Sequence, residues 1–335
     1  MKYVTIIDIA RELGISKSTV SRALAGDARN VKPETMRRIQ EAANRMGYQR
    51  NELAVNLRRQ MTKNIGIVIP EGVTPFFMNF IQQAQKEMRD KGFRTIIAVS
   101  NEDPEQELEN LTMLENCRID GIMICPCHKS KNLDAYKRMI QEGIPMVFFD
   151  RKINDLNVSQ VCIDDDLMSH FMVEALIRRG RKHIVHIAGP NFVSNAVDRY
   201  HGYREALEKF NIPYDPRYVV DGGLTAEEGI QAMEQFLSYG LPFDAIFGFT
   251  ETSILGAKSV LQKLHYKIPE DVALCCISGT TLCTLVYPTI SAVEQPVTQM
   301  ASEACRILQR QIETHDLTSE KIVLRGNMKL RESTA

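Results

Sequence analysis

Several features that would mark other classes of protein are missing from this sequence of 335 residues. No run approaches 18 consecutive apolar residues, about the length that a membrane-spanning helix needs. The opening MKYVTIIDIARE places Asp8, Arg11 and Glu12 where a secretory signal peptide requires an unbroken apolar stretch. We therefore expect a cytoplasmic protein. Its 44% hydrophobic and 25% charged residues fit two or three folded domains rather than a disordered chain.

The standard catalytic motifs are missing as well. The sequence has no GxSxG nucleophile elbow, no Walker A loop, no HExxH zinc motif and no GxGxxG opening a helix. The run Asp164–Asp166 could hold a cation, but a loop or a helix start is the favoured interpretation. The basic run at 178–183 is interpreted as a helix end whose charges complement the helix dipole. We predict no catalytic residues and no cofactor.

The eight cysteines favour neither disulfides nor metal binding. Most lie beside Ile, Met, Val or Leu in strand-like runs, which is typical of reduced thiols in a core. The one cluster, Cys125-Pro-Cys-His128, lacks a standard zinc spacing, and no second CxxC or HxxxH pair accompanies it. We therefore predict no metal site.

Positive charge is concentrated at the start of the chain, although the net charge is only -1. Residues 1–63 contain 13 Lys and Arg against 6 Asp and Glu, whereas residues 64–335 contain 28 against 36. A basic head before an acidic body fits a polyanionic partner, and a solvated surface is the alternative interpretation.

Three short helices are predicted in the first 50 residues. Thr5 can cap the first helix, which Gly14 ends, and Ser16 can cap a second helix only two residues later. Two short helices joined by so tight a turn have the geometry of a helix-turn-helix. The third helix begins near Pro33 and ends at Gly47.

The second predicted helix carries more hydroxyls than its stability requires, since Ser and Thr are mediocre helix formers. Short hydroxyls beside a lysine and an arginine suit a helix laid in the DNA major groove, where Arg22 can pair with guanine and Ser16 and Thr19 can reach phosphates. The alternative is a solvated helix with incidental hydroxyls. The candidate DNA-binding residues of this region are Thr5, Ser16, Lys17, Ser18, Thr19, Ser21 and Arg22.

Beyond Lys63, short apolar runs alternate with longer amphipathic stretches, without an internal repeat or low-complexity segment. This alternation predicts parallel β-sheets covered by helices, an α/β architecture. The predicted strands are 65–70, 94–100, 121–125, 145–150, 183–189, 218–222, 244–249 and 271–277.

The segment VTIIDIARELGISKSTVSRALAG, followed by VKPETMRRIQEAANRMGYQRNELAVNL, resembles the DNA-binding headpiece of the LacI/GalR family of bacterial transcription regulators. The resemblance continues to the end of the chain and implies a multi-domain fold. An all-α helix-turn-helix headpiece (1–50) and a hinge helix with linker (51–63) would precede a periplasmic-binding-protein-like core (64–335) for effector binding and dimerisation. The core would consist of two Rossmann-like subdomains with crossovers near residues 163, 293 and 323: an N-subdomain (about 64–163 and 293–322) and a C-subdomain (about 164–292 and 323–335).

The resemblance also assigns a hinge helix to Asn51–Arg58. In relatives, the residues that match Ala54 and Leu57 enter the minor groove and kink the duplex, which costs unstacking energy but increases contact with the protein. A helix of this length is only marginally stable by itself, and DNA and the hinge of the partner subunit would therefore have to stabilise it. The headpiece departs from the family pattern at three positions, Ala25, Lys32 and Arg50, and the first two put individual phosphate contacts in doubt.

A small-molecule effector, a sugar or sugar derivative, is implied for the cleft between the subdomains. The resemblance points to Phe76, Phe77, Asp150 and Arg199, and the family commonly has Asn-Asp at Thr250-Glu251 and an aspartate at Ser278. A hydroxyl lacks the charge-assisted grip of a carboxylate. We therefore expect Arg199 to be the main anchor, which favours a carboxylate or phosphate ligand, with a neutral sugar stacked on Phe76 or Phe77 as the competitor. The Phe pair could instead belong to the core, and Arg199 to the surface.

Together these observations predict an effector-controlled DNA-binding transcription regulator, a repressor in the bacterial nucleoid that reads double-stranded operator DNA as a homodimer. Effector binding would shift the equilibrium between DNA-competent and free states. No heptad pattern follows residue 326, which favours a dimer over a tetramer. The alternative is a cytoplasmic solute-binding protein without a DNA role, which the basic headpiece disfavours.

Overall fold

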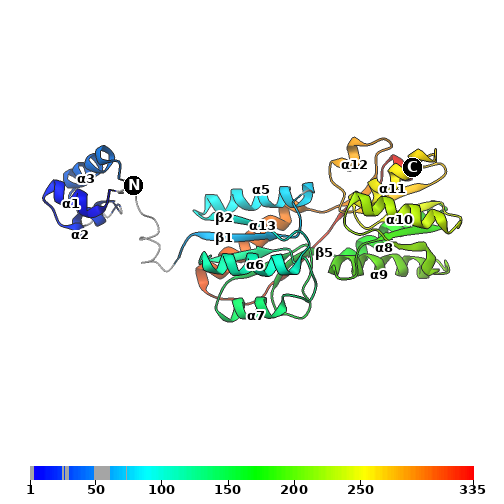
Figure 1. Ribbon diagram of the computed structural model, residues 1–335, viewed down its shortest axis with the longest axis horizontal. Helices are drawn as coiled ribbons and strands as arrows, with labels where there is room; N and C mark the ends of the chain where they lie inside the picture. The colour runs from blue at the N-terminus through cyan, green and yellow to red at the C-terminus, as the bar shows by residue number, and fades with distance from the viewer. Residues whose placement is uncertain (1–3, 25, 27–29, 49–60, 73) are drawn as a thin grey trace. The chain divides into compact units, whose positions relative to one another are not determined.

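The computed structural model describes residues 4–24, 26, 30–48, 61–72 and 74–335. The chain forms two compact units, Met1–Thr62 and Lys63–Ala335, which Figure 1 labels by their helices and strands. Within the described residues, no helix has the length and apolar character needed to cross a membrane.

The first unit is built on three helices, α1 (Ile6–Leu13), α2 (Lys17–Leu24) and α3 (Pro33–Met46). Thr5 and Asp8 form a reciprocal capping box at the start of α1. Gly14 and Gly47 end α1 and α3 with φ of 65° and 69°, in the left-handed region that favours glycine. The core of this unit consists of Ile9, Ala10, Val20, Ala23, Val31, Ile39, Ala42 and Ala43. The predicted helix-turn-helix fold is confirmed.

Part of the prediction cannot be placed on this structure. The hinge segment 51–58, with Ala54 and Leu57, lies outside the described residues, as do Ala25 and Arg50. Lys32 precedes α3 and makes no side-chain cap.

The second unit contains two six-stranded sheets, each covered by helices on both faces (Figure 1). The first sheet, here called the N-subdomain with its helices, has the order β11-β5-β4-β3-β1-β2 and is parallel throughout. Its strands are β1 (Asn64–Ile69), β2 (Arg94–Val99), β3 (Gly121–Ile124), β4 (Met146–Phe149), β5 (Ser159–Ile163) and β11 (Lys321–Leu324). Helices α5 (Pro75–Asp90) and α13 (Val297–Thr314) cover one face, and α6 (Pro104–Asn116) and α7 (Leu133–Gln141) cover the other.

The second sheet, the C-subdomain with its helices, has the order β12-β10-β9-β8-β6-β7. Its strands are β6 (Ile184–Ala188), β7 (Val219–Asp221), β8 (Ala245–Gly248), β9 (Ala273–Ile277), β10 (Ser291–Glu294) and β12 (Asn327–Lys329). Only the β10–β12 pair is antiparallel among the described pairings. Helices α8 (Asp165–Ile177) and α9 (Ser194–Lys209) pack together on one face, and α10 (Ala226–Ser238) and α11 (Glu251–Lys263) on the other; the short α12 (Leu282–Leu285) follows β9.

All eight predicted runs contain strands, so the two α/β subdomains with parallel sheets are confirmed. The sequence did not predict β5, β10, β11 and β12. β5 begins with polar residues, β10 (SAVE) has only two apolar residues between a serine and a glutamate, and β11 and β12 lie at sheet edges with largely exposed side chains. The eight cysteines are unpaired, and seven are buried.

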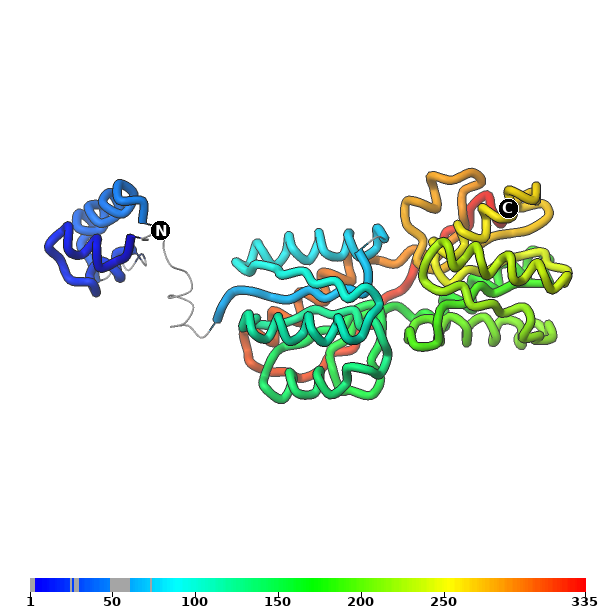
Figure 2. The backbone as a smooth tube through the Cα atoms, viewed as in Figure 1, coloured from blue at the N-terminus to red at the C-terminus, as the bar shows by residue number. Residues whose placement is uncertain are grey.

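The chain passes between the two sheets three times, as Figure 2 shows. It crosses after β5, between β10 and α13, and between β11 and β12. The second and third crossings lie two or three residues beyond 293 and 323, because β10 and β11 extend to residues 294 and 324 before the chain leaves their sheets.

Candidate functional site

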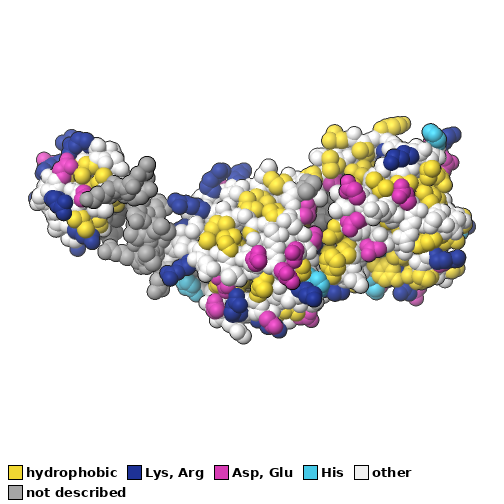
Figure 3. Space-filling model, in the orientation of Figure 1, with side chains coloured by type: hydrophobic (Ala, Val, Ile, Leu, Met, Phe, Trp, Pro, Cys, Tyr) yellow, Lys and Arg dark blue, Asp and Glu magenta, His cyan; other side chains and the backbone are white. Residues whose placement is uncertain are grey.

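Helix α2 presents a polar face away from the core of the first unit. Val20 and Ala23 are buried, whereas Lys17, Ser18 and Arg22 are exposed. Neither Lys17 nor Arg22 forms an ion pair with the part of the chain that the structure describes, so both cations face solvent. Figure 3 shows Lys and Arg side chains at several places on the visible surface of this unit.

Two of the predicted DNA-binding hydroxyls also begin helices. The Ser16 hydroxyl accepts the Thr19 backbone N–H at 3.1 Å and lies 2.8 Å from the hydroxyls of Ser18 and Thr19. Thr5 donates its hydroxyl to Asp8 at 2.7 Å. A helix start gathers unpaired N–H groups that favour a phosphate. The start of α2 therefore suits backbone contacts with DNA, and its exposed cations suit base contacts.

The predicted effector residues lie near the carboxyl ends of strands, where open α/β sheets bind ligands. Asp150 directly follows β4, Ser278 directly follows β9, and Phe76 lies in the first turn of α5. A cavity of about 850 Å³ lies beside α5 and the loop after β9. Phe76 and Ser278 line it, together with polar side chains that include Asn79, Gln83, Thr280, Glu294 and Gln295.

Asp150 and Ser278 share an unusual backbone conformation. Their φ angles are 61° and 58°, in the left-handed region that costs a residue with a side chain roughly 1–3 kcal/mol. Such strain persists only where the surrounding structure enforces it, and it is typical of ligand-binding sites. Each residue directly follows a central strand, so its left-handed conformation turns the chain at the point where the chain leaves the sheet.

Arg199, on α9, is almost completely buried, with 1% of its surface exposed. Its Nε and Nη2 lie 2.8 Å from Asp165 Oδ1. Nη1 donates to the Phe249 carbonyl at 2.8 Å, and Nη2 donates to Ser278 Oγ at 3.1 Å. The guanidinium carbon also lies 4.8 Å from the centre of the Phe249 ring.

This arrangement corrects the expectation that Arg199 is a free anchor for an anion. Burial raises the pKa of Asp165 to about 6, although the nearby Arg199 lowers it, so the carboxylate is charged at neutral pH. Its charge neutralises the guanidinium. Of the two interpretations of Asp164–Asp166, a loop or a helix start, the structure shows the helix start, with Asp164 as the cap of α8. The pairing of Asp165 with Arg199 was not predicted.

The two aromatic candidates have different environments. Phe76 and Phe77 are 6% and 5% exposed, and their rings meet edge to face at 5.0 Å. Phe77 also contacts Phe149, which stacks on Phe80 at 3.7 Å within the N-subdomain. Phe76, by contrast, lines the cavity. Phe76 is therefore the ring that a ligand in the cavity can contact, whereas Phe77 packs between Phe76 and Phe149.

Thr250 and Glu251 hold the second subdomain together rather than lining the cavity. The Thr250 hydroxyl caps α11 by accepting the Ser253 N–H at 3.4 Å. The buried Glu251 carboxylate accepts the Thr280 backbone N–H at 2.7 Å and its hydroxyl at 2.7 Å. Burial raises the pKa of Glu251. This pair fixes the loop after β9 that carries Ser278.

Two residues that the sequence analysis missed, Asn195 and Gln295, complete the polar surroundings of Asp150 and Ser278. Asn195 Nδ2 donates to Asp150 Oδ2 at 3.3 Å, and Gln295 Nε2 donates to Ser278 Oγ at 2.6 Å. Three buried oxygens, Asp150 Oδ1, Asn195 Oδ1 and Gln295 Oε1, have no hydrogen-bond partner among the described residues. All three oxygens can accept a hydrogen bond, and Gln295 also lines the cavity.

Contacts on one side of the cleft join the subdomains. Lys152 donates to Asp198 at 2.6 Å, and its backbone N–H donates to Ser194 at 2.8 Å. The Lys129 N–H donates to the Phe192 carbonyl at 2.9 Å. These polar contacts span the edge of the cleft, and they can break and re-form when the subdomains move.

Comparison with known proteins gives consistent matches along the whole chain. Residues 62–327 match the family described as periplasmic binding proteins and sugar binding domain of LacI family, and residues 5–51 match the bacterial regulatory proteins of the lacI family. Catabolite control protein A of Priestia megaterium is 27% identical over 332 residues, covering 99% of each chain.

Two solved structures are similar over nearly the full length. A complex of the transcriptional regulator CelR with cellobiose shows 26% identity and a TM-score of 0.75, covering 98% of this chain and 99% of the other. A lac repressor dimer bound to operator and the anti-inducer ONPF shows 20% identity and a TM-score of 0.87, covering 99% of each chain. The chain belongs to the LacI family of DNA-binding transcription regulators, which are not enzymes.

Proposed function

We propose that this protein is an effector-controlled repressor that binds operator DNA as a homodimer in the bacterial cytoplasm. The observation that carries the DNA-binding role is the exposed polar face of α2, where Lys17 and Arg22 have no acidic partner among the described residues. Arg22 pairs with a guanine, and the hydroxyls of Ser16 and Thr19 position the helix on phosphates. From the family resemblance, Ala54 and Leu57 enter the minor groove.

A pair of variants tests these roles. Arg22→Ala should cost about 1–3 kcal/mol of operator binding and relax specificity at one base pair of each half-site. Thr19→Ala should weaken all sequences alike, because a phosphate contact carries no base information. Both variants would be titrated against an operator and its single-base substitutions. An Arg22→Ala loss that is equal on every sequence would contradict the base-reading role.

The homodimer is supported by an apolar surface on the C-subdomain. Leu285 and Tyr287 are 77% and 81% exposed, and Leu282 beside them is 36% exposed. Figure 3 shows apolar side chains protruding where α12 lies. Large exposed apolar side chains that lie together mark interaction sites. Sedimentation of wild type and Leu285→Lys tests this: the variant should dissociate at lower protein concentration, whereas unchanged association would exclude this surface.

The effector is a neutral, hydroxyl-rich molecule of the sugar class rather than an anion. The unpartnered acceptors Asp150 Oδ1, Asn195 Oδ1 and Gln295 Oε1 each require a donor, which sugar hydroxyls supply. The Asp165 carboxylate neutralises Arg199, and the described residues that line the cavity itself include one cation, Lys86, together with one carboxylate, Glu294. An apolar sugar face can rest against the Phe76 ring. The CelR structure, similar over the full chain, contains cellobiose.

A thermal-shift screen of sugars, sugar phosphates and nucleobases tests the ligand class. We expect stabilisation by one or more neutral sugars that a rise in ionic strength leaves unchanged. Asp150→Ala should weaken binding by about 1–3 kcal/mol, as expected for loss of a charged hydrogen-bond acceptor. Salt-sensitive binding of a sugar phosphate would refute the neutral class. The alternative of a solute-binding protein without a DNA role would require that gel shifts with genomic fragments show no specific complex.

A further inference from the structure

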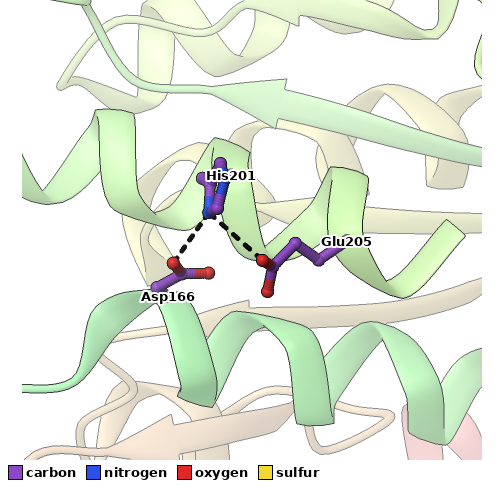
Figure 4. A group of neighbouring side chains, drawn as sticks. All are labelled: Asp166, His201 and Glu205. Atoms are coloured by element: carbon purple, nitrogen blue, oxygen red, sulfur yellow. Dashed lines mark hydrogen bonds and ion pairs between the residues drawn. The ribbon is translucent and has the colours of Figure 1, made fainter. Parts of the chain in front are cut away.

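Helices α8 and α9 carry a group of histidines and carboxylates that neither the DNA-binding face nor the effector cleft uses. Asp166 and His170 are four residues apart on α8, and His201 and Glu205 are four residues apart on α9. Residues at this spacing share one helix face. Figure 4 shows Asp166, His201 and Glu205 pointing toward one another.

The nitrogen and oxygen atoms of this group lie close together. His201 Nδ1 is 2.7 Å from Asp166 Oδ2 and 3.8 Å from Glu205 Oε1. One ligand atom from each of these three residues lies within 4.8 Å of the others. His170 Nδ1 is 4.0 Å from Glu205 Oε2, so a second imidazole borders the same space.

The backbones of the two helices hold this geometry. A Cβ atom at Gly202 would lie 2.1 Å from the Asp166 carbonyl oxygen, so only glycine permits so close an approach. His201 is the neighbour of Gly202 on α9. The distance between the two helices at the site is therefore set by main-chain packing, not by the exposed side chains.

The charges in the group are not balanced by the protein alone. Two carboxylates, Asp166 and Glu205, face one imidazole at His201. Asp166 Oδ1 is buried and has no hydrogen-bond partner among the described residues. The side chains of His201 and Glu205 are 60% and 51% exposed, so an ion can reach them. A dication would neutralise both carboxylates and satisfy the unpartnered oxygen.

His170 lies beside this group. Its Nε2 lies 3.3 Å from Glu174 Oε2, while its Nδ1 faces Glu205. Histidines that bind metals commonly donate their other nitrogen to a carboxylate in this way. Lys209 lies 3.4 Å from the same Nε2, but its shorter contact, at 2.8 Å, is with Glu174. Nδ1 thus remains directed at the group.

We propose that Asp166, His170, His201 and Glu205 bind a divalent transition-metal ion, with Zn²⁺ as the best match. Two imidazoles and two carboxylates form a donor set that Zn²⁺ accepts in tetrahedral geometry, at about 2.0–2.2 Å from each ligand. Tetrahedral ligands at that distance are roughly 3.3–3.6 Å apart. The separations of 2.7 Å between His201 and Asp166 and 3.8 Å between His201 and Glu205 lie on either side of this value, and His170 would join from its present position 4.0 Å from Glu205.

The test is calorimetric titration of the full-length, chelator-treated protein with ZnCl₂. We expect one ion per chain, with affinity at least about tenfold weaker in His201→Ala and in Glu205→Gln. His265→Asn removes an exposed histidine on a different surface and serves as the matched control, with unchanged affinity. Circular dichroism of each variant shows whether the fold is retained. Equal binding by wild type and both site variants, or no binding by the wild type, would overturn the proposal.

Co²⁺ spectroscopy separates this site from the cysteines, of which Cys117 is exposed. Nitrogen and oxygen ligands give Co²⁺ d–d bands without a thiolate charge-transfer band. We expect that spectrum in wild type and Cys117→Ser, and its loss in His201→Ala. A thiolate band that disappears in Cys117→Ser would refute the site. Unchanged affinity in His170→Gln would overturn the four-ligand set. None of these readouts depends on DNA or effector binding.

Discussion

Replacing Arg199 with methionine should destabilise the core at neutral pH and do so less in acid. Arg199 and Asp165 are 1% and 0% exposed, and two guanidinium nitrogens lie 2.8 Å from the same carboxylate oxygen. Removing one partner of a buried ion pair leaves an uncompensated charge and costs about 3–5 kcal/mol. We therefore expect Arg199→Met to lose about 3–5 kcal/mol of unfolding free energy at pH 7.5.

The pH dependence follows from Asp165. Without Arg199, burial and the nearby Asp150 raise the pKa of this carboxyl and only Lys152 still lowers it, so its folded pKa rises above the value of about 6 in the wild type. Because its folded pKa is raised, the folded variant takes up a proton as the pH falls, and its unfolding free energy increases by about 1.4 kcal/mol per pH unit. The unfolding free energy of the wild type increases less over the same range. The difference between the two proteins should shrink by about 2 kcal/mol between pH 7.5 and pH 5.5.

Urea unfolding of the full-length protein at both pH values measures these differences. Arg204→Met is the matched control, because it removes an exposed arginine from the same helix, whose guanidinium carbon lies 4.5 Å from the centre of the Tyr214 ring and 6.0 Å from that of Tyr200. It should cost less than about 1 kcal/mol at either pH. The double variant Arg199→Met/Asp165→Leu should recover most of the loss, since a buried pair can be replaced by apolar groups. A loss below about 1 kcal/mol, or the same loss at both pH values, would refute this reasoning.

Three further outcomes are expected. Burial lowers the pKa of His186 to about 4, so its neutral form stabilises the fold above the unfolded value of 6.5 and this stability is lost as the pH falls. Wild type should therefore lose about 2 kcal/mol relative to His186→Phe between pH 7.5 and pH 5 in urea unfolding, and parallel curves would contradict this. Ile39→Ala should destabilise the first unit by about 2–5 kcal/mol, because Ile39 is fully buried in the core of that unit. If calorimetry shows a change only in the melting of the second unit, the two units do not have separate cores. Phe76→Ala should weaken sugar binding by about 0.5–1.5 kcal/mol in calorimetry, and a larger affinity loss from Phe77→Ala would reverse the roles assigned to the two rings.

The first unit could be predicted from sequence because its signals are local. Thr5 pairs with Asp8 three residues away, and Gly14 and Gly47 end helices through their own backbone angles. Each of these features depends on a few neighbouring residues. The eight apolar runs could also be predicted as strands, since a buried parallel strand is apolar on both faces. That signal is weak in β5, which begins with polar residues, in β10, which has polar residues at both ends, and in the exposed strands β11 and β12. Only pairing with distant strands defines these four.

The chemistry of the cleft was decided by the tertiary structure. Sequence and family resemblance together pointed to Arg199, but its charge is cancelled by Asp165, 34 residues earlier in the chain. Asn195 and Gln295 are ordinary polar residues in sequence, and they matter because the fold buries their oxygens without partners. Burial and the identity of an ion's partner depend on which segments pack together, and those two quantities set the energy of a charge or a polar atom. Residue types alone carry neither, so the sequence predicts candidate residues, whereas packing decides whether the charge of Arg199 is available to a ligand.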